Sequence, residues 1–190
     1  MAMAMNLLHR WLCSSARWEK TSATQIIPWV LDEVELGDAT LEIGPGYGAN
    51  IRALRERTPE LTGVEIDPAL AARLRDRHAG RIRVIDGDGA AMPLPDREFS
   101  AVVSFTMLHH VPTPTLQDAV FAEAFRVLRS GGVFAGSDGL DRFAFRLVHL
   151  GDTCVPVPPA TLPERLTRAG FTDVKVESGV GSFRFSARRP

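Results

Sequence analysis

The chain has 190 residues, of which 45% are hydrophobic and 24% are charged, so its size and composition fit one globular domain with an ordinary core. Its 22 basic and 23 acidic residues give a formal net charge of -1, which argues against a nucleic-acid partner. No apolar run approaches the roughly 18 residues of a membrane span, and the beginning of the chain lacks the pattern of a secretion signal. We therefore expect a cytoplasmic protein without a membrane span. Cys13 and Cys154 lack the spacing of metal ligands, so we expect reduced thiols and no bound metal.

The helical stretches at the beginning of the chain come before any strand. Ser22, followed by Gln25 three residues later, forms a capping box that predicts a helix starting there and running to about Val34. We therefore expect residues 1–38 to form a helical preface to the rest of the domain.

From Ala39 onward, short apolar runs rich in β-forming residues alternate with amphipathic segments. This alternation predicts an α/β fold with a doubly wound, mostly parallel sheet and helices on both faces. The predicted strands cover residues 40–43, 61–66, 82–85, 101–105 and 133–136, and the predicted helices cover residues 51–56, 69–77 and 116–128. Gly131 and Gly132 are expected to stop the last of these helices.

The end of the chain is predicted to be less regular. A proline-rich stretch around Pro156 and Pro163 precedes a helix near residues 162–169, and strands are expected at 173–177 and 183–187. We expect a single domain over residues 1–190, with a cofactor-binding core at 39–138 and a segment on the substrate side, with the last two strands, at 139–190.

A glycine-rich turn lies directly between a predicted strand and a predicted helix. Gly44, Gly46 and Ala49 match the pattern G-x-G-x-x-A, in which glycines let the backbone approach a ligand at the helix N-terminus. Because several nucleoside cofactors use this arrangement, the turn alone does not distinguish among them.

Acidic residues follow the next two strands at the same edge of the sheet. Glu65 ends the second strand, where a ribose diol needs a bidentate acceptor, and Ile66 would lie against an adenine face. After the third strand, Asp88 in an acidic turn is placed to accept a hydrogen bond from an adenine amino group.

Five segments in this order resemble the class I S-adenosylmethionine-dependent methyltransferases, most closely the type 11 subgroup that contains the ubiquinone and menaquinone C-methyltransferases. They are Glu42-x-Gly44-x-Gly46-x-Gly48, Gly63-Val64-Glu65-Ile66-Asp67, Gly87 to Asp96, Phe99 to Val111 and Arg126 to Gly132. The resemblance covers roughly residues 39 to 138. It implies a Rossmann-like sheet of seven strands, with the last strand antiparallel and inserted beside the fifth, and S-adenosylmethionine as the cofactor.

The resemblance also implies a role for each motif. Glu42 would orient the methionine amino group, the Gly44, Gly46 and Tyr47 loop would pass under the carboxypropyl arm, and Glu65 would hold the ribose hydroxyls. Asp88 and the Gly89 N–H would contact the adenine edge, and Ser104 would contact the methionine part. Two features depart from the pattern: Gly89 stands where alanine is common, and the chain is short after the fifth strand, where relatives often carry a substrate cap.

The sequence gives fewer signals for the residues that would contact the methyl acceptor. His109 and His110 follow the fourth strand at the ligand-binding edge and are the candidates for a general base, if the small-molecule acceptor must lose a proton. Asp138, Asp141 and His149 are further candidates for the same cleft, although loop or helix-surface roles are favoured for them. For Trp11, Trp18 and Trp29, apolar packing is favoured over covering an acceptor.

Three functions remain open at this point. The first is transfer of a methyl group to an oxygen, carbon or nitrogen of a small molecule, which accounts for all five motifs. The second is a nicotinamide-dependent oxidoreductase, which leaves the Asp88 turn unexplained and for which no catalytic tyrosine–lysine pair exists, since Tyr47 is the only tyrosine. The third is a cofactor-binding protein that no longer methylates.

Overall fold

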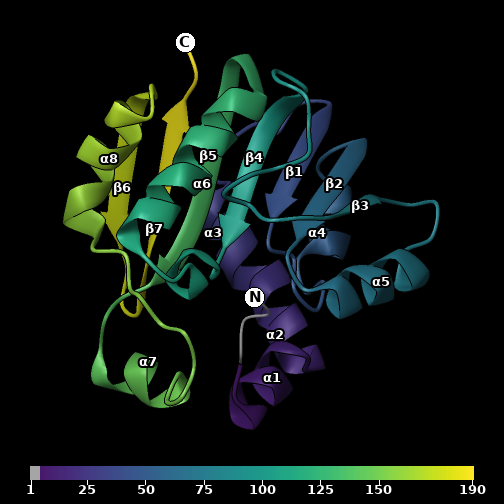
Figure 1. Ribbon diagram of the computed structural model, residues 1–190, viewed down its shortest axis with the longest axis vertical. Helices are drawn as coiled ribbons and strands as arrows, with labels where there is room; N and C mark the ends of the chain where they lie inside the picture. The colour runs from purple at the N-terminus through teal and green to yellow at the C-terminus, as the bar shows by residue number, and fades with distance from the viewer. Residues whose placement is uncertain (1–4) are drawn as a thin grey trace.

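A seven-stranded sheet forms the centre of the fold in the computed structural model, which describes residues 5–190 (Figure 1). Its strand order is β3-β2-β1-β4-β5-β7-β6. The strands are β1 (Ala39–Ile43), β2 (Glu60–Glu65), β3 (Arg83–Asp86), β4 (Phe99–Phe105), β5 (Leu128–Gly139), β6 (Thr172–Ser178) and β7 (Ser182–Arg188). β1 to β5 are parallel, and β7 runs antiparallel between β5 and β6. The predicted α/β sheet, including the inserted antiparallel last strand, is therefore confirmed.

Helices cover both faces of this sheet. On one face, α6 (Pro114–Val127) and α8 (Leu162–Arg168) pack on a core that includes Phe134 and Phe185. On the other face, α3 (Ile27–Val30), α4 (Ile51–Arg55) and α5 (Pro68–Arg77) pack on a second core that includes Val103 and Ala135. Val102 and Val103 belong to opposite cores because successive side chains of β4 point to opposite faces.

The helical preface is present, with its helices between Leu7 and Val30, but its predicted starting signal is wrong; residues 1–4 lie outside the described part of the chain. α1 (Leu7–Cys13) and α2 (Ala16–Thr21) come first, and a π-helical turn at Ser22–Ile26 joins α2 to α3. The cap belongs to Ser15, whose side chain accepts from the backbone N–H of Trp18 at 3.1 Å. Ser22 lies inside the continuous helical path, and its buried hydroxyl donates to Asn50 instead.

The predicted helix stop at Gly131 and Gly132 is also wrong. α6 ends at Val127 and the chain enters β5 at Leu128 without a turn, so both glycines lie inside that strand. α7 (Phe143–Val148) was not predicted at all, since its side chains are largely exposed and give no amphipathic signal.

The carboxyl ends of the parallel strands meet at one edge of the sheet, and two helices of the preface and the unpredicted α7 lie beside it. Figure 1 shows α1, α2 and α7 below this edge. In open α/β sheets ligands bind at this edge. None of the helices within residues 5–190 is long and apolar enough to cross a membrane.

The start of α6 depends on a side-chain cap that can be tested apart from the site. The Thr113 side chain accepts from the backbone N–H of Leu116 at 3.2 Å. We expect Thr113→Ala to lower the free energy of unfolding by about 1 kcal/mol, because this donor loses its partner. The measurement is the midpoint of chemical denaturation. Thr115→Ala, an exposed change inside the same helix, is the control, and an equal loss there would contradict the capping role.

Candidate functional site

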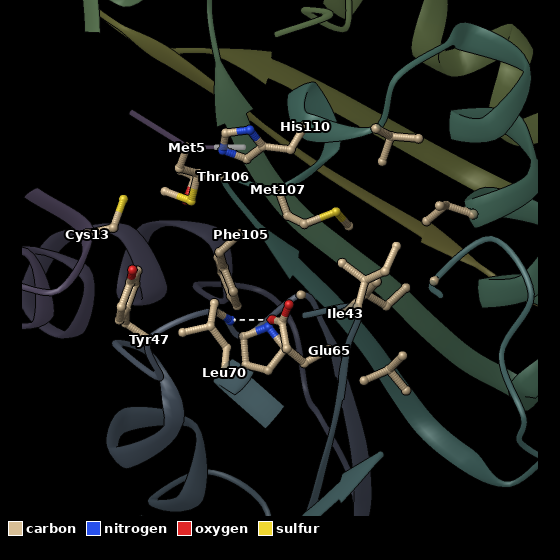
Figure 2. A pocket seen from close by; sticks show the side chains of 18 of the residues that line it. Met5, Cys13, Ile43, Tyr47, Glu65, Leu70, Phe105, Thr106, Met107 and His110 are labelled. Atoms are coloured by element: carbon tan, nitrogen blue, oxygen red, sulfur yellow. Dashed lines mark hydrogen bonds between the residues drawn. The ribbon is translucent and has the colours of Figure 1, made fainter. Parts of the chain in front are cut away.

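A cavity of about 280 Å³ opens at the carboxyl ends of β1 to β4. It receives the residues that follow each of these strands, and α1 and α2 contribute Cys13 and Trp18 to its lining. Figure 2 shows Glu65 at one end of the cavity, His110 at the other, and Cys13 and Tyr47 on one side. Of the predicted site residues, it brings together Gly44, Gly46, Tyr47, Glu65, Ile66, Asp88, Gly89 and His110.

The glycine turn forms the floor of the cavity after β1. Gly44 has a φ of +68°, and a side chain there would collide with Met107 across the cavity. Position 44 therefore requires glycine, because a larger residue would be strained at this φ and would displace Met107. The turn is held in place by the backbone N–H of Gly44, which donates to the Val64 carbonyl at 2.8 Å.

Glu65 is fixed at the end of β2 by two backbone donors. Its Oε2 accepts from the N–H of Gly46 at 2.8 Å, and its Oε1 accepts from the N–H of Asp67 at 3.0 Å. The residue is 3% exposed, and burial raises the pKa of its carboxyl. Each oxygen retains a lone pair, so a rigid bidentate acceptor faces the cavity.

Glu42 lies behind the glycine turn and is reached through Asn50. The Asn50 amide donates to Oε1 of Glu42 at 2.6 Å, while Oε2 is buried without a hydrogen-bond partner among the described residues. Burial, with a smaller contribution from the Glu65 charge, raises the Glu42 pKa to about 7. A cation that reached this carboxyl would stabilise its charged form. Asn50, which lines the cavity, was missed because an asparagine after a glycine turn gives no sequence signal of its own.

Another part of the cavity lining follows β2 and β3. Ile66 follows Glu65, and the turn after β3 brings Asp88 and Gly89 opposite it. One carboxylate oxygen of Asp88 accepts from the backbone N–H of Ala90 at 2.8 Å, which orients the turn. A side chain at position 89 would meet Ile43 at 2.7 Å, so glycine keeps this wall open.

The helical preface closes the side of the cavity. Arg10 of α1 donates to the Tyr47 hydroxyl at 3.2 Å, which connects the first helix to the glycine turn. Burial raises the pKa of the Cys13 thiol to about 11, and it also raises the pKa of Cys154, so neither residue is an activated thiolate. Trp18 lines the cavity, whereas Trp11 is 68% exposed and Trp29 packs under the Arg184 guanidinium.

The two candidate bases occupy different positions. His110 lines the cavity, and its Nδ1 lies 3.2 Å from the carbonyl oxygen of Thr153. Desolvation, together with the neighbouring histidines, lowers its pKa to about 3, so it is neutral near pH 7. His109 lies behind it, with Nδ1 2.5 Å from a buried Asp138 carboxylate oxygen.

Several other candidates do not reach the cavity lining. Ser104 is fully buried on β4 and its hydroxyl has no partner among the described residues. Asp138 is occupied by His109, and Asp141 is paired with Arg146 at 2.5 Å. The cavity instead receives Thr106, one of the few non-glycine residues with a positive φ, at 50°. Such backbone strain is typical of functional sites, and only the fold reveals it.

Comparison with solved structures identifies the class to which this fold belongs. The N-methyltransferase NodS from Bradyrhizobium japonicum, solved in complex with S-adenosylhomocysteine, superposes with a TM-score of 0.71 at 19% sequence identity. The alignment covers 95% of this chain and 91% of NodS. This similarity shows the Rossmann-like methyltransferase fold.

The sequence places the chain in a family. The family model described as methyltransferase domain matches residues 41–136, and the chain belongs to this family. A probable S-adenosylmethionine-dependent methyltransferase from Mycolicibacterium smegmatis is 34% identical over 74% of this chain and 52% of its own length. The ubiquinone/menaquinone biosynthesis C-methyltransferase UbiE from Methylobacterium nodulans is 36% identical over 58% of this chain and 50% of its own. The predicted type 11 resemblance is confirmed, and the chain spans about half the length of these relatives.

Proposed function

We propose that this protein transfers a methyl group from S-adenosylmethionine to an oxygen, carbon or nitrogen of a small-molecule acceptor. The observation that carries the proposal is the charge of the cavity. Glu65 and Asp88 line it, Glu42 lies directly behind it, and none of the described lining residues is lysine or arginine. Such a site suits a ligand that carries positive charge on a sulfonium and an ammonium group.

The residues present fit this cofactor in three respects. Glu65 offers two fixed acceptors for a ribose diol, and the buried, unpartnered Oε2 of Glu42 offers an acceptor that a cation would satisfy. At Gly44 and Gly89 an added side chain would collide with Met107 and Ile43, so only glycine lets these two turns keep their positions beside the cavity. Asp88 and the Gly89 N–H are assigned to the adenine edge, Ile66 to the adenine face, and Gly46 and Tyr47 to the carboxypropyl arm.

When bound, the cofactor supplies a methyl carbon on a positively charged sulfur, which an acceptor displaces in line. The chain then has to hold the acceptor in line with that carbon and exclude water. His110, at the end of the cavity opposite Glu65 (Figure 2), is the group that we place against the acceptor, where its neutral imidazole can accept a hydrogen bond from the acceptor. His109 and Asp138 support that position from behind, since the two histidine rings lie 4.1 Å apart.

The structure also favours this function over a nicotinamide-dependent one. A pyrophosphate binds to free N–H groups at the start of the helix, but the Gly46 N–H already donates to Glu65. The acids of the cavity would repel the pyrophosphate as well. Family membership points the same way.

Parallel calorimetric titrations with S-adenosylmethionine, S-adenosylhomocysteine and NAD test the cofactor. We expect both adenosyl-sulfur ligands to bind and NAD not to bind; binding of NAD alone would reverse the assignment. Incubation with methyl-labelled cofactor and a panel of quinols, phenols, sugars and amines then tests transfer. Cofactor binding without transfer to any member would favour the binding protein that no longer methylates.

A further inference from the structure

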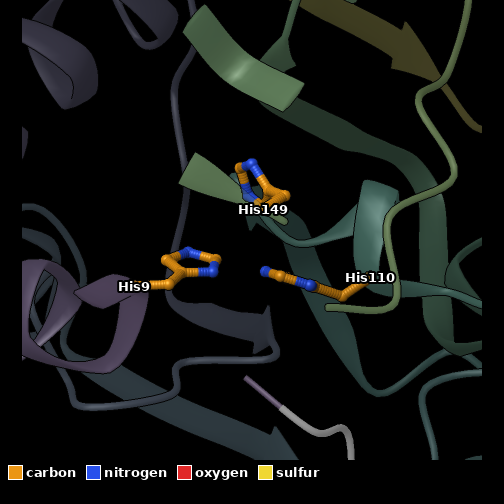
Figure 3. A group of neighbouring side chains, drawn as sticks. All are labelled: His9, His110 and His149. Atoms are coloured by element: carbon orange, nitrogen blue, oxygen red, sulfur yellow. The ribbon is translucent and has the colours of Figure 1, made fainter. Parts of the chain in front are cut away.

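Four of the five histidines of the chain gather at the acceptor end of the cavity. They come from segments far apart in sequence: His9 from α1, His109 and His110 from the turn after β4, and His149 from the end of α7. Figure 3 shows the His9, His110 and His149 rings converging on a common point between these segments. The proposed methyl transfer needs at most one of them, so the cluster requires another account.

In each of the three converging rings, Nδ1 is engaged by an oxygen outside the group. Nδ1 of His9 lies 2.7 Å from a carboxylate oxygen of Asp152, and Nδ1 of His149 lies 2.7 Å from the Phe145 carbonyl oxygen. Nδ1 of His110 faces the Thr153 carbonyl oxygen at 3.2 Å. Carbonyl and carboxylate oxygens only accept, so Nδ1 carries a proton in each ring, and in a neutral imidazole with this tautomer Nε2 carries the lone pair that can bind a metal ion.

The three histidines are buried, and few hydrogen-bond donors are available to their Nε2 atoms. His9, His110 and His149 are 5%, 6% and 7% exposed, and Nε2 of His149 has no hydrogen-bond partner among the described residues. One ligand atom from each of the three residues lies within 4.8 Å of the other two.

We propose that His9, His110 and His149 bind a divalent transition-metal ion of the zinc type through their three Nε2 atoms. Zinc–nitrogen bonds are about 2.0–2.1 Å long, so a small inward movement of the rings completes the site. Three histidines with an oxygen acceptor on each outer nitrogen are the arrangement that fixes the tautomer and orientation of zinc ligands. The binding of the ion does not depend on the proposed methyl transfer.

The proposed metal site lies beside the cavity, and this position indicates which group would be its fourth ligand. His110 lines the cavity, so the open coordination position faces the acceptor end, and a water or an oxygen of the acceptor occupies it. A zinc ion there would lower the pKa of an acceptor hydroxyl, so that its proton could leave to solvent. The resulting oxygen would form the bond to the methyl carbon as the carbon–sulfur bond of the cofactor breaks. In this state the ion, rather than the His110 imidazole, activates the acceptor; this last step alone rests on the proposed function.

Titration of the untagged, chelator-treated protein with Co(II), followed by competition with Zn(II), tests the site. We expect one equivalent of Co(II) to give the visible absorption of a tetrahedral complex and Zn(II) to displace it. His149→Ala and His9→Ala should each abolish this absorption, while Asp152→Asn should weaken metal affinity by about 10- to 100-fold. His78→Ala, which removes the one histidine outside the cluster, is the control and should bind as the unmodified protein does.

Absence of the absorption at millimolar Co(II), or its survival in both His9→Ala and His149→Ala, would overturn the proposal. A measurement on the unmodified protein decides the matter if those variants fail to fold. In proton–nitrogen correlation spectra of the imidazoles, Zn(II) should shift the Nε2 signals of three histidines and leave that of His78 unchanged. Equal shifts of all histidines, or no shift, would also overturn the site.

Discussion

Replacing Glu65 by alanine is expected to weaken S-adenosylmethionine binding by about 100-fold or more. Two hydrogen bonds from ribose hydroxyls to a charged carboxylate are each worth about 1.5–3 kcal/mol, and a loss of about 2.8 kcal/mol already corresponds to 100-fold. The carboxylate is fixed by Gly46 and Asp67 before any ligand arrives, so its removal also frees the glycine turn. Calorimetric titration measures the dissociation constant.

Asp86→Ala is the matched control for this change. Asp86 pairs with Glu65 in the register of β2 and β3, but it is exposed and lies outside the cavity lining. We expect its removal to leave the dissociation constant within about two-fold, since surface substitutions away from a site have small effects. An unchanged affinity in Glu65→Ala would reject the ribose assignment.

Replacing Glu42 by glutamine is expected to stabilise the ligand-free protein at about pH 8 while weakening cofactor binding. The carboxyl has a pKa of about 7 in the folded chain against an ordinary value of 4.5. Folded protein therefore holds a proton that unfolded protein releases, and stability is lost as pH rises from about 4.5 through about 7. At about pH 8 the shift corresponds to about 3 kcal/mol. The carbonyl oxygen of glutamine can still accept the hydrogen bond from Asn50. Because glutamine does not ionise, the variant does not lose stability as the pH rises.

Denaturation of both proteins at about pH 5 and about pH 8 measures this effect. We expect near-equal free energies of unfolding at the lower pH and a more stable Glu42→Gln variant at the higher pH. Glu33→Gln, at an exposed glutamate whose side chain is 76% accessible, is the control and should show no such pH dependence. A difference that is the same at both pH values would contradict the raised pKa.

The elements that hold the cofactor side could be predicted because each has a local cause. The apolar runs of β1 to β5, the glycine turn at Gly44 and the acid at Glu65 lie in short, continuous segments, and the structure places them as expected. The predicted start of a helix is wrong where a residue that could cap the helix makes a different contact. Ser22 has the identity of a cap, but its hydroxyl donates to Asn50 inside a longer helical path.

The end of the cavity that we assign to the acceptor could be predicted only in part, because tertiary contacts create it: His110 was a candidate, whereas its meeting with His9 was not foreseen. His9, His110 and His149 are separated by at least 39 positions along the chain and meet only because α1 and α7 close on the same edge of the sheet. The Asn6 amide brings α1 there by donating to the Val148 carbonyl at 2.9 Å. No periodicity or motif encodes such an encounter, so His9 and Asp152 gave no signal in the sequence.

The division between the two sides of the cavity follows the order of the chain. Residues 41–136, which the family model matches, contain the residues that we assign to the cofactor, whereas α1, the end of α7 and the segment after α7 surround His110 through His9, His149 and Thr153. On the proposed function, changes in these two peripheral segments would alter the surroundings of His110 while the sheet stays the same. The first helix joins both halves, since Arg10 contacts the glycine turn and His9 contacts the histidines. On the proposed metal site, the first helix and α7 would have to change together, because each supplies one of the three histidines.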